Sequence, residues 1–141
     1  MRAVTIIMFL AVTMFSAHGQ CGSSTKCSPN LEKYSLLKTY PIDLPQRESK
    51  MDAPKQLDWP VILSKGIRYR ITGCPNRAHS STDMVMGLHL GSKLISTNKS
   101  KDGKTYKAFE FVCNKTGVYY LKAYFVNGVK GCGAASLSMS K

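Results

Sequence analysis

The sequence predicts an all-β protein, an antiparallel jelly-roll-like β-sandwich of about eight strands that follows a cleaved signal peptide. Apolar and polar residues alternate with a period of two in a series of short runs, which is typical of strands with one buried face. Turn residues separate these runs, and no convincing helical pattern follows the first 19 residues. The aromatic-rich segment 109–125, FEFVCNKTGVYYLKAYF, is expected to form the centre of the core.

The first 19 residues have the pattern of a signal peptide. Met1 and Arg2 supply a positive start, residues 3–15 form an apolar run, and small residues at 16–19 favour cleavage before Gln20. The run is shorter than the roughly 20 residues that span a bilayer. A lipoprotein with lipid on Cys21 is the alternative, but the residues before that cysteine fit it poorly. We expect a secreted, periplasmic or cell-surface protein without a transmembrane segment in the mature chain.

The chain is strongly basic, with 20 lysines and arginines, 8 acidic residues and a formal net charge of +12. Such a charge suits a polyanionic partner, namely nucleic acid, an acidic polysaccharide or an anionic membrane surface. The basic residues are scattered, however, and only the lysines between 93 and 107 are dense, in a segment that has the composition of a loop. A solvated basic surface is therefore the preferred interpretation, and no specific nucleic-acid partner is expected.

Five cysteines follow the signal peptide, and in an exported protein they predict disulfides. They are Cys21, Cys27, Cys74, Cys113 and Cys132. The odd number leaves one free or paired between chains. A local Cys21–Cys27 bridge is plausible, and two of the other three are expected to pair, although spacing does not choose between them. No two cysteines have the two-residue spacing of a zinc knuckle, so neither a metal nor a cofactor is expected.

The chain divides into a signal peptide (1–19), an N-terminal tether with one strand and a linker (20–54), and the sandwich domain (55–141). The tether's strand is indicated by alternating apolar residues from Tyr34 to Leu44. A helix over 31–38 is the alternative, and Pro41 would end it. The linker is the charged segment from Pro45 to Pro54.

Within the domain, each run of alternation predicts one strand. The expected strands cover 57–63, 67–72, 84–90, 94–95, 105–113, 118–126 and 131–139, with turns at 64–66, 91–93, 114–117 and 127–128. Pro60 has no N–H to donate, so the first of these strands should lie at a sheet edge or carry a bulge. In the second, Ile67, Tyr69 and Ile71 should face the core while Arg68 and Arg70 face solvent.

The candidate binding surface lies on the strand at 118–126. Tyr119, Leu121, Ala123 and Phe125 share the face expected to enter the core. Tyr120, Lys122 and Tyr124 share the other face, and with Arg68 and Arg70, if these lie nearby, they could bind sugar rings or an acidic polymer. The alternative is that both tyrosines are buried in the second sheet. Trp59 is expected to anchor the core.

Catalytic chemistry is not indicated. His79 and His89 are the only imidazoles after the signal peptide; the first lies in a loop, and the second is expected on an exposed strand face. Neither forms a recognisable nucleophile–base pattern, and no two carboxylates are placed for glycoside chemistry. Asn98 and Asn114 begin N-x-S/T sequons, and both also have the character of turn residues.

Residues 55–140 resemble the bacterial pre-peptidase C-terminal domain, a jelly-roll-like β-sandwich appended to secreted enzymes. The similar segments are Leu57–Trp59 with the turn Ser64–Gly66, Asp83–Leu88 with Leu94–Ser96, Thr116–Tyr120, and Leu137–Ser138. The chain is also similar to small stand-alone secreted proteins of Bacteroidetes, which have a Lys-x-Tyr strand like Lys38–Tyr40 here.

The resemblance implies a sandwich that acts as an accessory module, although no catalytic domain in cis is expected here. In the family, the chain crosses from one sheet to the other at the position of 114–117, which would place Cys113 at the sandwich edge, where it could be bridged. Val85 replaces the second acidic residue of the family's Asp-x-Asp strand, so a calcium site is not expected.

The sequence therefore predicts a secreted, non-enzymatic β-sandwich that binds a surface polysaccharide or another cell-surface polymer, or an envelope protein. The alternative is a structural or interaction component of the envelope, linked to its neighbours through the unpaired cysteine.

Overall fold

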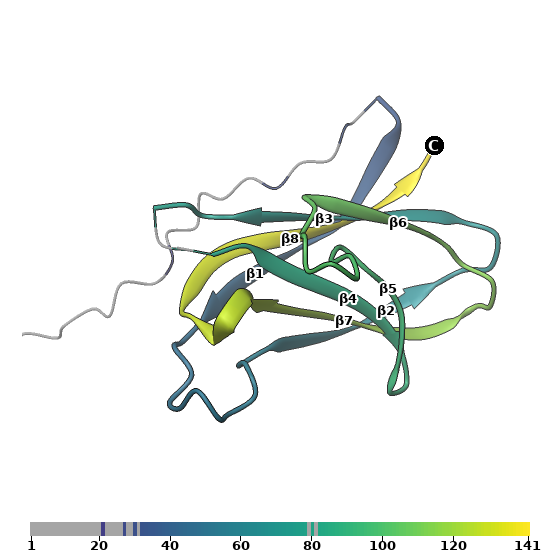
Figure 1. The fold of residues 1–141 in the computed structure, drawn as a ribbon. Helices are drawn as coiled ribbons and strands as arrows, with labels where there is room; N and C mark the ends of the chain where they lie inside the picture. Colours follow the sequence, from purple (N-terminus) through teal and green to yellow (C-terminus); the bar gives the residue numbers. More distant parts are fainter. Residues whose placement is uncertain (1–20, 22–26, 28–29, 31, 79, 81) are drawn as a thin grey trace, which may run out of the picture.

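The computed structural model describes residues 21, 27, 30, 32–78, 80 and 82–141, so the signal peptide expected at 1–19 lies outside the described residues. Within these described residues, eight strands and one short 3₁₀ turn follow one another (Figure 1). They are β1 (Tyr34–Leu44), β2 (Leu57–Leu63), β3 (Arg68–Pro75), β4 (Met84–Leu90), β5 (Lys93–Thr97), β6 (Ala108–Val112), β7 (Gly117–Phe125), η1 (Val126–Gly128) and β8 (Gly131–Ser140).

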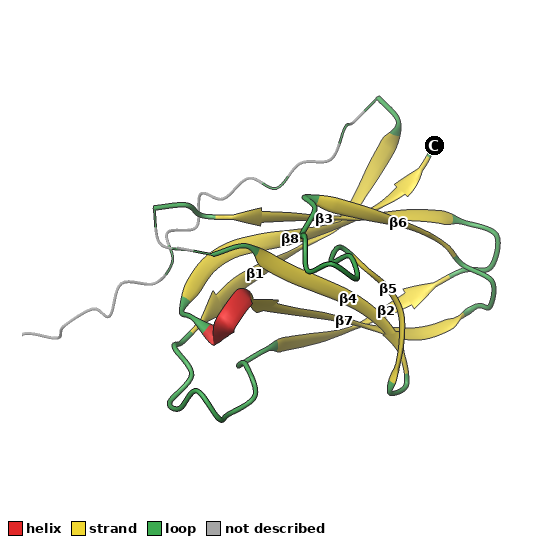
Figure 2. Cartoon of the chain, viewed as in Figure 1, coloured by secondary structure: helices red, strands yellow, loops and turns green. Residues whose placement is uncertain are grey.

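The strands form two four-stranded sheets that lie as two layers (Figure 2). Sheet A has the order β1-β8-β3-β6, and sheet B has the order β2-β7-β4-β5. Every pairing between named strands is antiparallel. Because the chain passes repeatedly from one sheet to the other, this is the eight-stranded jelly-roll arrangement. The predicted fold class is confirmed.

The core fills the space between the sheets and comes from one face of each layer. Leu63, Leu88 and Leu121 from sheet B and Ile71 from sheet A are fully buried there. The four residues of β7 predicted to point inward, from Tyr119 to Phe125, are all buried in the same cluster. Trp59 is half-buried, packs against this cluster and contacts the ring of Tyr40, with ring centroids 5.0 Å apart.

The segment 109–125 connects the two layers. β6 belongs to sheet A and β7 to sheet B, so the break at 114–117 carries the chain across the sandwich, as the family resemblance implied. The turn predicted at 127–128 is also present. Asn127 and Gly128 both have positive φ, 62° and 64°, a conformation that Asn and Gly adopt most readily.

The first strand is part of the sandwich and not of a tether. Tyr34–Leu44 is extended, so the helix considered for 31–38 is not formed over its described part from Tyr34. The strand pairs with β8 along its length, with a bulge between Leu36 and Lys38. The boundary placed at residue 55 therefore cuts through one structural unit. The loop 45–56 that follows β1 connects sheet A to sheet B.

The edge position predicted for the strand containing Pro60 is confirmed, because β2 is the first strand of sheet B and pairs only with β7. One side of an edge strand has no neighbouring strand, so a proline whose missing N–H faces that side costs the sheet no backbone hydrogen bond.

The disulfides differ from the expected ones. The bridges are Cys21–Cys132 and Cys27–Cys74, with Cα–Cα distances of 5.4 and 5.5 Å, and Cys113 is a buried free thiol. Alternation along β3 and β8 turns Cys74 and Cys132 to the outer face of sheet A, whereas Cys113 faces the core. Neither a Cys21–Cys27 bridge nor a bridge at Cys113 is formed.

Candidate functional site

The tyrosine surface predicted on β7 lies on the outer face of sheet B, which excludes the alternative that both rings are buried in the core. Tyr120 is 38% exposed and lies opposite Pro60 on β2 and His89 on β4. Lys122 lies between the two tyrosines, and its Nζ is 3.7 Å from a carboxylate oxygen of Asp58. Tyr124 is half-buried and packs against the edge of the core. The surface therefore offers the exposed ring of Tyr120 and the ammonium group of Lys122, which is already paired with Asp58.

Arg68 and Arg70 do not join this surface, because they lie on β3 and point outward from the opposite sheet. Both guanidinium groups pair with Glu110 on β6, at 3.3 and 3.0 Å. The hydroxyl of Tyr34 also donates to this carboxylate. The Tyr34 hydrogen bond and then the two arginines hold the pKa of Glu110 below its usual range. The cluster ties β1, β3 and β6 together, and the predicted five-residue surface is not formed.

A groove of about 510 Å³ opens at the edge of the sandwich where the ends of the two sheets meet the β5–β6 loop. Figure 1 shows this loop, in green, between the two layers. The groove is lined by Gly73, Cys74, Pro75, Arg77, Asp83, Met84, Asn98, Thr105, Tyr106 and Lys107. Its apolar lining residues Gly73, Pro75 and Met84 belong to β3 and β4, and most of its polar lining residues lie at Arg77, Asp83 and in the segment 98–107.

Asp83 joins these two loops. Arg77 Nη2 lies 2.7 Å from one of its carboxylate oxygens, and the Thr105 hydroxyl donates to the other at 2.7 Å. The Thr105 hydroxyl, followed by the Arg77 guanidinium, holds the pKa of Asp83 below its usual range. The carboxylate is therefore ionised at neutral pH and its charge is compensated within the protein.

Asn98 holds the β5–β6 loop against sheet B. Only 3% of the residue is exposed, and its side-chain oxygen accepts from the Met86 N–H at 2.7 Å. Its amide nitrogen donates to the Met84 carbonyl at 2.9 Å and to the Tyr106 carbonyl at 2.8 Å. Since the amide is buried and fully used, the Asn98 sequon is closed to modification in the folded protein. Asn114, in contrast, lies in the exposed turn before β7.

The groove carries excess positive charge. A second hollow of about 530 Å³ shares Arg77, Asp83 and Thr105 with the first and adds Lys104. Lys104 Nζ lies 5.4 Å from the ring centroid of Tyr106, which is 51% exposed. Within the described part of the chain, neither Lys104 nor Lys107 forms an ion pair. The groove and the adjoining hollow together thus present the ammonium groups of Lys107 and Lys104 beside the exposed ring of Tyr106.

No pattern in the sequence predicts this groove. The one signal is the density of lysines between 93 and 107, and that segment has the composition of a solvated loop. Arg77, Asp83 and Tyr106 carry no local pattern that marks them as neighbours. They meet because the β5–β6 loop lies against the segment between β3 and β4, where Thr105 and Arg77 both contact the carboxylate of Asp83.

Other reactive groups are engaged in packing. His79 lies outside the described residues. His89 is half-buried over Gly87 rather than on an exposed face as expected, and its buried Nδ1 has no hydrogen-bond partner among the described residues. The Cys113 thiol donates to the Lys115 carbonyl at 3.1 Å, beside the Tyr119 hydroxyl. Burial, and then the neighbouring thiol, raise the pKa of Tyr119.

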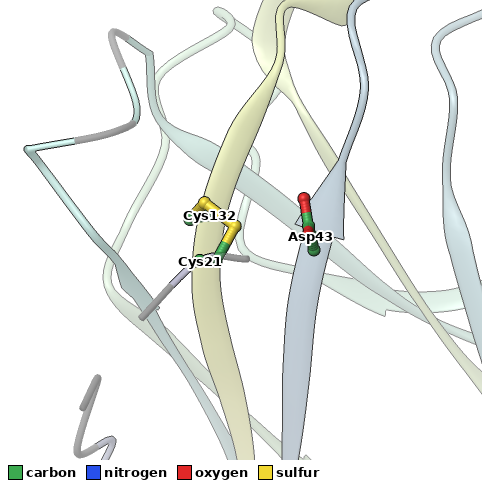
Figure 3. A group of neighbouring side chains, drawn as sticks. All are labelled: Cys21, Asp43 and Cys132. Atoms are coloured by element: carbon green, nitrogen blue, oxygen red, sulfur yellow. A yellow bond between two sulfur atoms is a disulfide. The ribbon is translucent and has the colours of Figure 1, made fainter. Parts of the chain in front are cut away.

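One group among the described residues has the composition of a metal site. Cys21, Asp43 and Cys132 place two sulfurs and a carboxylate within 4.8 Å of one another (Figure 3). The two sulfurs form a disulfide with each other and so offer no thiolate in this state.

No family model and no curated protein match the chain. The resemblance to the pre-peptidase C-terminal domain therefore stays a prediction. Among solved structures, the chain is similar to PliG of Aeromonas hydrophila, a periplasmic lysozyme inhibitor of g-type lysozyme. The two are 11% identical over 77% of this chain and 85% of that one, with a TM-score of 0.45. This likeness is too weak to bear on function. No helix in the described part of the chain is long and apolar enough to span a membrane.

Proposed function

We propose that this protein is an exported, non-enzymatic binding module that takes an anionic group of a surface polymer or protein in the groove at the β5–β6 loop. The observation that carries the proposal is the charge of the groove. Lys107 lines the groove and Lys104 lines the adjoining hollow, and among the described residues neither has a carboxylate partner. The one carboxylate in the lining of the groove, Asp83, is already paired with Arg77.

The chemistry of the walls suits an anion attached to a larger, partly apolar group. Ammonium groups supply charge-assisted hydrogen bonds to a carboxylate, sulfate or phosphate. The exposed Tyr106 ring gives a flat surface for a sugar ring or an apolar side chain. The groove is also preorganised, because the Asn98 hydrogen bonds and the Asp83 contacts hold the loop in place before a ligand arrives.

Export fits this role. Two disulfides join the described residues, and such bridges persist in oxidising compartments outside the cytosol. The basic net charge of the chain would also speed encounters with an acidic partner.

Heparin chromatography and calorimetric titration with poly-L-glutamate test the proposal. The double variant Lys104→Gln/Lys107→Gln should weaken binding about tenfold or more, since a charged hydrogen bond contributes roughly 1.5–3 kcal/mol. The matched control is Lys55→Gln/Lys65→Gln, which removes the same charge from exposed positions outside the groove. Equal weakening by both variants would show that binding follows net charge alone, and the groove proposal would then be wrong.

A second comparison separates the groove from the predicted tyrosine surface. Tyr106→Ala and Tyr120→Ala each remove one exposed ring without changing the charge. The groove proposal expects weaker binding only for Tyr106→Ala. If only Tyr120→Ala weakened binding, the ligand site would lie on the outer face of sheet B, where the sequence predicts the binding surface.

A further inference from the structure

We propose that the Cys21–Cys132 disulfide is the oxidised form of a metal site. When a dithiol reductant opens the bridge, the two thiolates and the carboxylate of Asp43 form a three-ligand site for a soft or borderline divalent cation such as Zn²⁺. The proposal is independent of the anion-binding groove.

The geometry is fixed by the sheet. Asp43 on β1 lies directly opposite Cys132 on β8, so their side chains rise from neighbouring strands on the same face. Cys21 lies over this pair, as Figure 3 shows, and all three ligand atoms lie within 4.8 Å of one another. Bonds of about 2.3 Å to sulfur and about 2.0–2.2 Å to a carboxylate oxygen can be made from such a group with small side-chain movements.

The surroundings leave the bridge accessible and favour the thiolate form of its cysteines once it is opened. The bridge borders a hollow of about 690 Å³, and both cysteines are only partly buried, so a reductant and a hydrated cation can approach. Arg77 and Lys130 line the same hollow, and nearby cations favour the thiolate form of cysteine. A water molecule would complete a tetrahedral coordination shell.

Reduction of the bridge by a dithiol precedes metal binding. The external dithiol transfers two electrons and two protons to the bridge and becomes a disulfide itself, which leaves two thiols in the protein. The cation then replaces the two thiol protons, which are released to solvent. Re-oxidation by an external disulfide re-forms the bridge and expels the cation, because that disulfide accepts the two electrons, takes up two protons from solvent and becomes two thiols.

The second bridge provides an internal control. Cys27 is only 3% exposed. Among the described residues, no carboxylate lies beside the Cys27–Cys74 bridge in the way that Asp43 lies beside Cys21 and Cys132. Opening this bridge would give two thiols without a third ligand.

The test is titration of the phosphine-reduced mature protein with Cd²⁺, followed by the thiolate-to-cadmium absorption band in the ultraviolet. Mass spectrometry confirms that Cys21–Cys132 is open. We expect one Cd²⁺ per chain in the reduced protein and no band in the oxidised protein. Asp43→Asn should weaken binding about tenfold or more, as loss of even an outer-shell partner does. Asp58→Asn, the same change on the opposite sheet, should leave binding unchanged.

Two further variants make the result decisive. Cys27→Ser/Cys74→Ser should retain the band and Cys21→Ser/Cys132→Ser should lose it. Equal affinity in the Asp43→Asn and parent proteins, or a band that follows Cys27 and Cys74, would overturn the proposal. Loss of the native near-ultraviolet circular dichroism on opening Cys21–Cys132 would overturn it too, because the site needs β1 and β8 to stay paired.

Discussion

At the scale of single residues, the groove depends on Asn98. Its amide makes three hydrogen bonds in a buried position and connects β4 to the loop that carries Tyr106. The sequence marks Asn98 only as a turn residue and as the start of a sequon, exactly as it marks Asn114. Burial separates the two, and burial is a property of the assembled sheets.

We predict that Asn98→Ala lowers the free energy of unfolding by roughly 2–4 kcal/mol, because it leaves buried backbone groups without partners. Urea denaturation measures this change. The same variant should weaken anion binding in the groove, since the loop loses its attachment. Asn114→Ala is the matched control, and as an exposed substitution it should change the stability by no more than about 0.5 kcal/mol. Similar losses in both variants would contradict the role assigned to Asn98.

At the scale of elements, alternation along each strand predicted most of the inward and outward faces. In β2, Ile62 is 77% exposed while the adjacent Leu63 is completely buried. The pattern was less informative for β4, where Val85 on the outer face is also buried. A central strand has neighbours on both sides that cover its outer face, and the local sequence does not show which neighbours these are.

Substitutions at two adjacent positions of β2 test this alternation. Leu63→Ala should lower the free energy of unfolding by roughly 2–5 kcal/mol, because it leaves a cavity in the core. Ile62→Thr should change it by no more than about 0.5 kcal/mol, because the side chain is in solvent and threonine suits a strand. Both values come from chemical denaturation. Comparable losses at the two positions would mean that the outer face of β2 is covered in solution.

At the scale of the whole molecule, the two disulfides join residues that are far apart in sequence, 111 and 47 positions. Chain-entropy arguments allow such links to contribute up to roughly 4–5 kcal/mol each. Both bridges lie on the outer face of sheet A, and the fifth cysteine is enclosed between the sheets. This arrangement bears on the alternative function, in which the unpaired cysteine links the protein to the envelope.

We predict that Cys113 is unreactive in the folded protein, because its residue is only 1% exposed. An aromatic disulfide reagent should detect no thiol under native conditions and one thiol per chain in denaturant. Non-reducing electrophoresis should show a monomer. Cys113→Ser should abolish the signal in denaturant. Reaction of the thiol under native conditions, or a dimer that a reductant separates into monomers, would instead support the alternative function as a covalently linked envelope component.

Sequence patterns alone were enough to predict the class of fold, the positions of most strands, the edge position of the Pro60 strand and the face of β7 that enters the core. These features depend on alternation and turn chemistry within a few residues. Other features are visible only in the folded chain: the cysteine pairing, the separation of Arg68 and Arg70 from Tyr120, the membership of β1 in sheet A, and the groove around Asp83. Each of these depends on which strands become neighbours, and that choice is made by long-range packing of two sheets.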